Sequence, residues 1–141
     1  YQTKGHRLEA GTPKIAEAIG WDAALGYLAQ LDLEEEHHRL LNIARYVADE
    51  LRSLNMTVYG RHDEQDSAVV SFLHPSLHSE DLAHLLDARG VAVRTGHHCA
   101  QPLLHRLGIN GTVRASFYIY NTMQEAEQFI QHTKDILERF A

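Results

Sequence analysis

The sequence predicts an α+β domain in which helices cover one face of a small, mostly antiparallel sheet. Three observations favour this fold class. Two long segments with helical periodicity come first, several short β-prone runs follow them, and an amphipathic helix ends the chain. At 141 residues the chain is long enough for one compact domain with its own core and well short of two.

Two helices are expected in the first third of the chain. The Thr12-Pro13 pair suits a helix N-cap followed by proline at the first helical position. From Lys14 to about Leu31 apolar residues recur at roughly helical spacing, although two glycines weaken the middle. The segment from 34 to 54 is more strongly periodic and has three glutamates at its N-terminal end, where negative charge is favoured.

Shorter elements follow residue 54, where the hydrophobic period changes. Runs of β-branched and aromatic residues bounded by polar turns predict strands. A helix that opens at Ser79 is expected to end at Gly90, because glycine readily adopts the left-handed conformation at a helix C-terminus. The expected order is strands over 56–60 and 67–73, a helix over 79–89, a strand over 91–94, a helix over 102–107, a strand over 112–118 and a helix over 123–140.

Composition narrows the class of protein. Thirteen basic against nineteen acidic residues give a net charge of −6, so the basic footprint of a nucleic-acid binder is missing. No apolar run approaches the roughly 20 residues that span a bilayer. With a single cysteine and no signal peptide at the start, we expect a cytoplasmic protein without an internal disulfide. The missing initiator Met suggests a piece of something longer.

The only cysteine lies in the segment Arg94-Thr95-Gly96-His97-His98-Cys99-Ala100-Gln101-Pro102, a loop ahead of a short helix. Nearby cationic groups or a following helix N-terminus lower a thiol pKa, so Cys99 suits a nucleophile. Two other interpretations stay open, a metal ligand together with His97 or His98 and a structural cysteine. The metal site is less favoured, because adjacent histidines in an extended segment point to opposite sides.

Two further features have a functional and a structural interpretation. Arg114 lies in a strand among apolar residues, where it must either reach a carboxylate or face solvent, and its planar fork would suit the carboxylate of an amino-acid substrate. Gly11 and Thr12 could offer backbone N–H groups and a hydroxyl to a phosphate. From the sequence alone a simple helix cap is the commoner explanation for that segment.

Three motifs together resemble one family. The Cys99 segment from Arg94 to Leu103, then Gly111-Thr112-Val113-Arg114-Ala115-Ser116 and Tyr120-Asn121-Thr122, resemble the C-terminal region of cysteine desulfurases of the SUF/CSD type. The opening Arg7-Leu8-Glu9-Ala10-Gly11-Thr12-Pro13 is similar to the segment that enters this region. The family belongs to the aminotransferase class V group of pyridoxal-phosphate enzymes. Its members convert L-cysteine to L-alanine and keep the sulfur as a persulfide.

The resemblance implies a role for each predicted site residue. Cys99 is similar to the nucleophile that takes sulfur from the substrate and carries the persulfide. Arg114 is similar to the arginine that holds the substrate carboxylate, and Arg94 to a second active-site arginine. Gly11 and Thr12 resemble residues that reach the cofactor phosphate of the neighbouring subunit. His97 and His98 match the motif without an assigned role.

The resemblance also implies what this chain lacks. The lysine that holds pyridoxal phosphate belongs to a large domain, so residues 1–13 are expected to be a connecting segment and 14–141 the small C-terminal domain. We expect the isolated chain to be inactive and the parent enzyme to be a homodimer. Its partner would be a sulfur acceptor of the SufE type, serving iron–sulfur cluster assembly or sulfur trafficking. Selenocysteine lyase activity, or a non-catalytic binding or regulatory module, are the alternatives.

Overall fold

The chain, seen in a computed structural model, is described over residues 11–60 and 67–140. Its contacts divide it into two units, Tyr1–Glu34 and Glu35–Ala141. The division expected from the sequence, between residues 13 and 14, stays a prediction about the domains of the whole protein. Each unit is taken by itself below.

The N-terminal unit contains helix α1 (Ile15–Leu28). The residue before the helix is Lys14, which makes no side-chain capping bond, so the prediction that Thr12 caps this helix is wrong. The chain first turns at Gly11, whose φ is +85°, and the helix begins two residues after proline instead of at it. No residue of α1 is buried, and Ile19 and Trp21 are 66% and 69% exposed. Among residues 11–34, therefore, α1 has no core to pack against.

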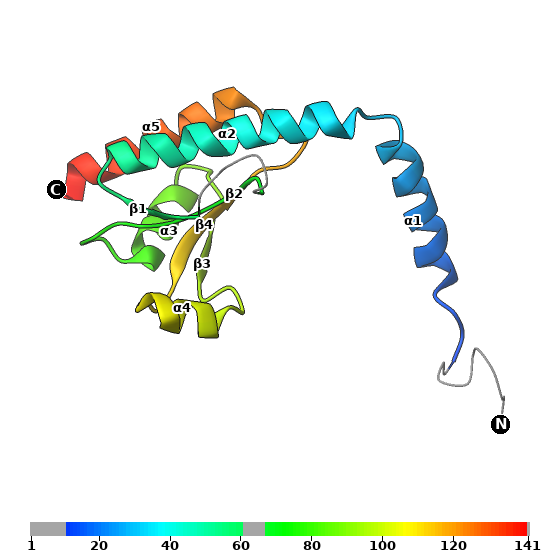
Figure 1. Cartoon of the computed structure of the whole chain (residues 1–141), viewed down its shortest axis with the longest axis horizontal. Coiled ribbons are helices and arrows are strands. Elements are labelled where there is room, and N and C mark those ends of the chain that lie inside the picture. The colour runs from blue at the N-terminus through cyan, green and yellow to red at the C-terminus, as the bar shows by residue number, and fades with distance from the viewer. Residues whose placement is uncertain (1–10, 61–66, 141) are drawn as a thin grey trace. The chain divides into compact units, whose positions relative to one another are not determined.

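The C-terminal unit joins a small sheet to several helices (Figure 1). The first two residues of its longest helix belong to the N-terminal unit. In chain order the elements are α2 (Leu33–Ser53), β1 (Thr57–Tyr59), β2 (Val69–Leu73), α3 (Ser79–Asp87), β3 (Arg94–Gly96), α4 (Gln101–Leu107), β4 (Thr112–Ser116) and α5 (Met123–Phe140).

The four strands form one antiparallel sheet in the order β1-β2-β4-β3. Val70 pairs with Ala115 and Phe72 with Val113, and all four side chains are buried. Because side chains alternate along a strand, the residues between them face away from the core. The predicted α+β class with a mostly antiparallel sheet is confirmed.

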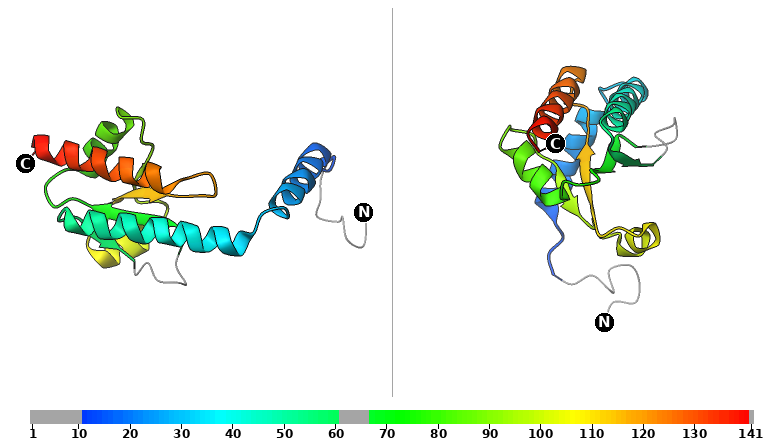
Figure 2. Two further views of the ribbon diagram at one scale, coloured as in Figure 1. Left: turned by 90° about the horizontal axis from the view of Figure 1, so that it is seen from above. Right: turned by 90° about the vertical axis from the view of Figure 1, so that its left-hand side faces the viewer.

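Helices α2, α3 and α5 pack on the same face of the sheet. Their buried side chains join those of β2 and β4 in one core, which includes Leu51 of α2, Leu86 of α3 and Ile130 of α5. Helices α2 and α5 run side by side along this face (Figure 2), where Lys134 Nζ lies 2.9 Å from Glu50 Oε2. Each fully buried aliphatic side chain contributes about 1.5–3 kcal/mol relative to exposure, so the apolar periodicity of α2 and α5 fixes this layer.

One strand was predicted in the wrong place. The sequence favours a strand over 91–94, but β3 runs from Arg94 to Gly96. Val91 and Val93 are half-buried against the core without pairing to β4. They follow Gly90, whose φ of +79° closes the end of α3 as expected, with the N–H of Val91 bonded to the carbonyl of Leu86. Their alternation therefore reflects packing under the helices and not membership of the sheet.

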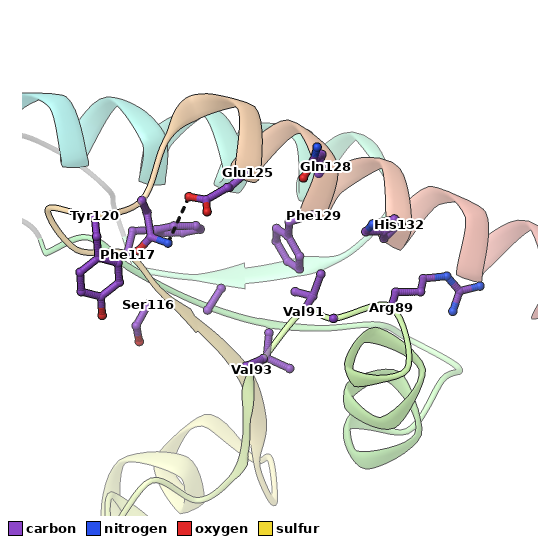
Figure 3. Close-up of a pocket in the computed structure, with 14 residues that line it drawn as sticks. Arg89, Val91, Val93, Ser116, Phe117, Tyr120, Glu125, Gln128, Phe129 and His132 are labelled. Carbon is purple, nitrogen blue, oxygen red and sulfur yellow. Dashed lines mark hydrogen bonds between the residues drawn. The ribbon is translucent and has the colours of Figure 1, made fainter.

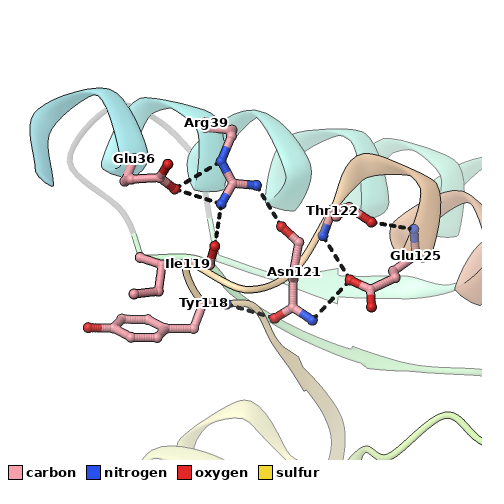
Figure 4. Close-up of polar contacts among 7 residues, drawn as sticks. All are labelled: Glu36, Arg39, Tyr118, Ile119, Asn121, Thr122 and Glu125. Atoms are coloured by element: carbon pink, nitrogen blue, oxygen red, sulfur yellow. Dashed lines mark hydrogen bonds and ion pairs between the residues drawn. The ribbon is translucent and has the colours of Figure 1, made fainter. Parts of the chain in front are cut away.

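A side-chain network fixes the connection between β4 and α5 (Figure 4). Arg39 of α2 donates to the carbonyl oxygens of Asn121 and Ile119 at 2.6 and 2.9 Å, and it pairs with Glu36 at 2.6 Å. The start of α5 has a capping box, since Thr122 and Glu125 bond each other's backbone N–H groups. These bonds fix the segment that directly follows β4, the strand that carries Arg114.

In the described parts of the chain, no helix has the length and apolar character needed to cross a membrane.

Candidate active site

Two arginines lie directly opposite each other on neighbouring strands. The register of β3 and β4 pairs Arg94 with Arg114, so both side chains project from the same face of the sheet. That face is opposite to the one covered by α2, α3 and α5, because Val113 and Ala115 on either side of Arg114 belong to the core. The sheet thereby brings together two residues that the sequence identified separately.

In the described part of the chain, no carboxylate neutralises either guanidinium group. Neither arginine pairs with a carboxylate among residues 11–60 and 67–140, and Arg114 Nε is buried without a hydrogen-bond partner. Like charges directly opposite each other destabilise a strand pair, and an unsatisfied buried donor is costly. An anion bound between the two arginines would relieve both penalties, and the planar guanidinium fork suits a carboxylate.

The Cys99 loop is a tight turn that follows β3. The backbone N–H of Cys99 donates to His97 Nδ1 at 3.0 Å, and the N–H of Ala100 donates to the carbonyl of His97 at 2.8 Å. His98 and Cys99 both have positive φ, 51° and 58°, which non-glycine residues rarely adopt. The thiol is exposed. Cys99 is therefore presented to solvent on a constrained backbone, which does not favour the interpretation as a structural cysteine.

His98 anchors the loop to β4. Its Nε2 lies 3.1 Å from both the carbonyl oxygen and the hydroxyl oxygen of Thr112. A carbonyl oxygen only accepts, so Nε2 carries the hydrogen, and in a neutral ring Nδ1 is then an acceptor. Within the described residues Nδ1 is buried and has no partner. Burial lowers the pKa of His98, and the charges of Arg114, Arg94 and His97 add to this effect against the opposing bond to Thr112.

A close backbone contact holds the ends of β3 and β4 together. A Cβ on Gly111 would lie 3.1 Å from backbone atoms of Gly96, tighter than side chains normally allow. Gly96 itself has a φ of +100° where the chain leaves β3 for the Cys99 loop. Glycine is thus required on both sides of this contact, which places the loop against the start of β4.

The remaining predicted residues lie in the N-terminal unit. Gly11 and Thr12 are exposed, and they come shortly before α1. That Gly11 and Thr12 bind a phosphate therefore stays a prediction. His97 and His98 bond different partners, Cys99 and Thr112, and among the described residues no three His, Cys, Asp or Glu side chains are close enough to hold a metal ion.

Two cavities of the C-terminal unit are lined by residues near the predicted site, and neither is lined by Arg94 or Arg114. One of about 440 Å³ is bounded by α5, the 89–93 segment and the end of β4 (Figure 3), with Arg89, Glu125 and His132 at its wall. A smaller one of about 200 Å³ lies behind the Cys99 loop and includes His97 and His105. The residues predicted for the chemistry thus lie on the sheet face opposite the helical layer and on the adjoining loop.

Sequence reasoning missed Thr112 and Gly111, which position the site without belonging to its chemistry. Thr112 fixes the His98 ring, and Gly111 admits the β3 backbone. The one signal available was their place in the motif Gly111-Thr112-Val113-Arg114, directly ahead of the strand arginine.

Comparison with protein families shows which family the chain belongs to. The model of the aminotransferase class V family matches residues 1–129. The chain belongs to the aminotransferase class V family. Among curated relatives, a probable cysteine desulfurase of Staphylococcus epidermidis is 38% identical over 136 residues, and one of Pyrococcus abyssi is 39% identical over 133 residues. These alignments cover 96% and 94% of this chain but only 33% of each relative.

Solved structures agree with the class V assignment. The apo cysteine desulfurase of Thermococcus onnurineus NA1 superposes with a TM-score of 0.90 at 38% identity, over 97% of this chain and 34% of its own. The S-sulfonic acid form of the cysteine desulfurase CsdA from Escherichia coli gives 0.88 at 36% identity, again over 97% and 34%. The class V chain thus has the fold of the C-terminal portion of these enzymes.

Proposed function

We propose that this class V chain is the small C-terminal domain of a pyridoxal-phosphate-dependent cysteine desulfurase. The observation that carries the proposal is the pairing of Arg94 with Arg114 on one sheet face, next to the exposed Cys99 loop. A carboxylate-binding pair beside an accessible thiol suits an amino acid that carries sulfur. The similarity to probable cysteine desulfurases supports the same substrate.

In this proposal Arg114 holds the carboxylate of L-cysteine, and Arg94 adds a second positive charge at the same site. Both are directed to the face that bears the Cys99 loop, which leaves the substrate sulfur to be met by the thiol. The unpartnered Nε of Arg114 supports a ligand there, because a bound carboxylate would accept its hydrogen.

Cys99 acts as the nucleophile. Its sulfur attacks the sulfur of the substrate, so that a sulfur–sulfur bond forms while the carbon–sulfur bond breaks. The electron pair of the broken bond stays with the carbon skeleton, which takes up a proton and leaves as L-alanine. Cys99 retains a persulfide. The exposure of the thiol and its constrained turn support this role, since the same atom must meet a substrate and then a sulfur acceptor.

The residues of this chain fit one part of a pyridoxal phosphate site. Gly11 has a positive φ and Thr12 is exposed, so a backbone N–H and a hydroxyl are free to bind a phosphate. The described lysines do not fit the attachment role: Lys134 is paired with Glu50 on the helical side of the sheet, and Lys14 precedes α1. When bound, the cofactor supplies the electron sink for the carbon skeleton. We propose that its lysine lies outside these 141 residues and that the isolated chain is inactive.

The partners follow from the same proposal. The parent enzyme is a cytoplasmic homodimer in which Gly11 and Thr12 serve the site of the neighbouring subunit. A sulfur acceptor of the SufE type takes the persulfide sulfur from Cys99 for iron–sulfur cluster assembly or related sulfur trafficking. The exposed position of Cys99 supports such a transfer between proteins.

The experiment is a comparison of variants of the full-length enzyme. Cys99→Ala should leave the absorbance of the bound cofactor unchanged and abolish persulfide and alanine formation from cysteine. Arg114→Lys should raise KM for cysteine, because an ammonium group cannot form the bidentate pair. Arg139→Lys, an exposed change on α5, is the matched control. Persulfide formation that survives Cys99→Ala would refute the role of the thiol.

A further inference from the structure

Charge is unevenly distributed along this chain. From residue 88 to 124 there is no Asp or Glu, while Arg89, Arg94, Arg106 and Arg114 fall in this stretch together with three histidines. The rest of the chain has nine basic and nineteen acidic residues, a net charge of −10. Because β3, the Cys99 loop, α4 and β4 all come from the acid-free stretch, the Cys99 end of the unit is positive and the helical layer negative.

Helix α4 presents an unusual surface next to the thiol. It begins two residues after Cys99, and of its side chains only Leu104 is buried. Leu103 and Leu107 are 56% and 47% exposed. Residues three and four apart lie on one side of a helix, so Leu103, Arg106 and Leu107 form a single patch, here called the α4 patch. At about 1.5 Å per residue the helix is only about 10 Å long, which keeps the patch close to Cys99.

The α4 patch is held as a rigid neighbour of the thiol. Gly108 closes the helix in the left-handed conformation, and the N–H of Ile109 bonds the carbonyl of Leu104 at 3.1 Å. On the other side of Cys99, His98 fixes the loop to Thr112. The loop is therefore tied to β4 through His98, and the helix that follows it has a closed C-terminal end, so a molecule that contacts the patch is positioned relative to the thiol.

We infer that the α4 patch is the docking surface for an acidic sulfur-acceptor protein, one with carboxylates around an apolar spot beside its own thiol. The inference rests on the proposed function, in which sulfur leaves Cys99 for a second protein. The positive charge around Cys99 and the α4 patch favours a partner with negative charge. The two exposed leucines on either side of Arg106 favour a protein with an apolar surface over a simple polyanion. The negative helical layer disfavours a long nucleic acid.

Thiol exchange at Cys99 in the 141-residue chain tests this without any desulfurase turnover. Cys99 is first converted to a mixed disulfide with an aromatic thiol whose thiolate absorbs visible light. A peptide thiolate then attacks the Cys99 sulfur, a new disulfide forms, and the aromatic thiolate leaves with the electron pair. The probes are three short peptides with one cysteine between leucines, flanked by aspartates, serines or lysines, and 2-mercaptoethanol.

The acidic peptide should react about tenfold faster than the lysine peptide at low salt, and the difference should shrink as salt is added. Arg106→Glu should abolish or reverse this preference, and the double change of Leu103 and Leu107 to Ala should slow every leucine peptide severalfold. The rate with 2-mercaptoethanol should change much less in either variant, because its thiolate has a single charge and no side chains to contact the patch. Arg139→Glu and Phe140→Ala, exposed changes at the end of α5, are the matched controls and should behave as the parent chain.

Three results would overturn the inference. The acidic and lysine peptides could react equally fast, Arg106→Glu could match Arg139→Glu, or a short DNA duplex could block exchange while the acidic peptide gains nothing, which would make the patch a polyanion site. The proposed function is tested by a different measurement, persulfide formation in the full-length enzyme, so its failure can be told apart from failure of this inference.

Discussion

The ring of His98 is held at two oxygens of Thr112, each 3.1 Å from Nε2, and it thereby fixes the residue before Cys99 to the strand that carries Arg114. Thr112 and Arg114 are two residues apart on β4 and so about 7 Å apart on the same face. The thiol loop and the strand arginine are thus parts of one constrained assembly.

Replacing His98 should loosen this assembly. His98→Ala removes the bond to Thr112 and leaves alanine at a φ of 51°, so we expect a loss of about 1–3 kcal/mol in the free energy of unfolding. His98→Asn should cost less, because asparagine tolerates the left-handed region. Urea denaturation of the 141-residue chain measures both, and hydrogen exchange at the Cys99 and Ala100 amides shows where protection is lost. Equal stability of the two variants and the parent would contradict the anchor.

Acid should destabilise the folded chain through His98, because a protonated ring there is buried and faces other positive charges. Burial and the facing charges of Arg94, Arg114 and His97 keep the pKa of His98 below its ordinary 6.5, so the unfolded chain binds a proton more readily than the folded one. Well above pH 6.5 the ring is neutral in both states and this proton linkage costs nothing. As pH falls from there towards the lower folded pKa, stability should decline. The decline in stability should be smaller in His98→Asn, which has no ring to protonate. Urea denaturation midpoints of both proteins, measured at the same series of pH values, check this. If the midpoint fell equally with pH in both, His98 would not be the group responsible.

Repulsion between Arg94 and Arg114 should lower the stability of the isolated chain. Arg94→Ala removes a like charge opposite Arg114, so we expect the free energy of unfolding at low salt to rise by about 0.2–1 kcal/mol. The gain should fade as salt screens the repulsion. Thermal unfolding at two salt concentrations checks this, with Arg139→Ala as the control. A loss of stability at low salt would mean that Arg94 has a stabilising partner.

Most of the fold was accessible from local pattern. The amphipathic stripes of α2 and α5 and the glycine that ends α3 are encoded within a few residues, and the structure confirms them. Val91 and Val93 misled the strand prediction, because alternation records which side chains are buried and not which backbone they pair with. The cap prediction at Thr12 failed for a similar reason, since a good capping residue does not compel a helix to start there.

For the candidate site too, the sequence identified some features and missed others. Cys99 could be singled out as a thiol in a loop with cationic neighbours, Arg114 as a charged residue in an apolar strand, and Arg94 as a neighbour of Cys99 and from the family resemblance. That Arg94 faces Arg114 depends on the register of two strands about twenty residues apart, and the His98 contact spans fourteen residues. Such pairings are set by the whole sheet, so the sequence identified the residues and left their geometry to the structure.

Arg39 should be needed for the connection between β4 and α5. Arg39→Ala leaves the carbonyl oxygens of Ile119 and Asn121 without their donor, so we expect a loss of about 1.5–3 kcal/mol. Arg39→Lys should recover only part of it, because one ammonium group cannot reproduce the planar fork that also binds Glu36. Urea denaturation gives the values, and Arg52→Ala on the exposed side of α2 is the control. A cost no larger than that of the control would show that the network is not needed.

Gly111 offers the most direct test of how β3 is joined to β4. In Gly111→Ala the new Cβ would lie 3.1 Å from the backbone of Gly96, and no flexible side chain is there to move aside. The strands must separate or shift. We therefore expect the free energy of unfolding to fall by about 1–3 kcal/mol and hydrogen exchange at the Gly96 and Thr112 amides to become faster. Gly20→Ala is the matched control, because a Cβ there meets nothing within 4 Å and alanine favours a helix interior. In the full-length enzyme the same shift would displace His98 from Thr112, so Gly111→Ala should lower persulfide formation at Cys99 more than it lowers cofactor absorbance. Full stability together with full persulfide formation in Gly111→Ala would mean that the two strands do not need this close approach.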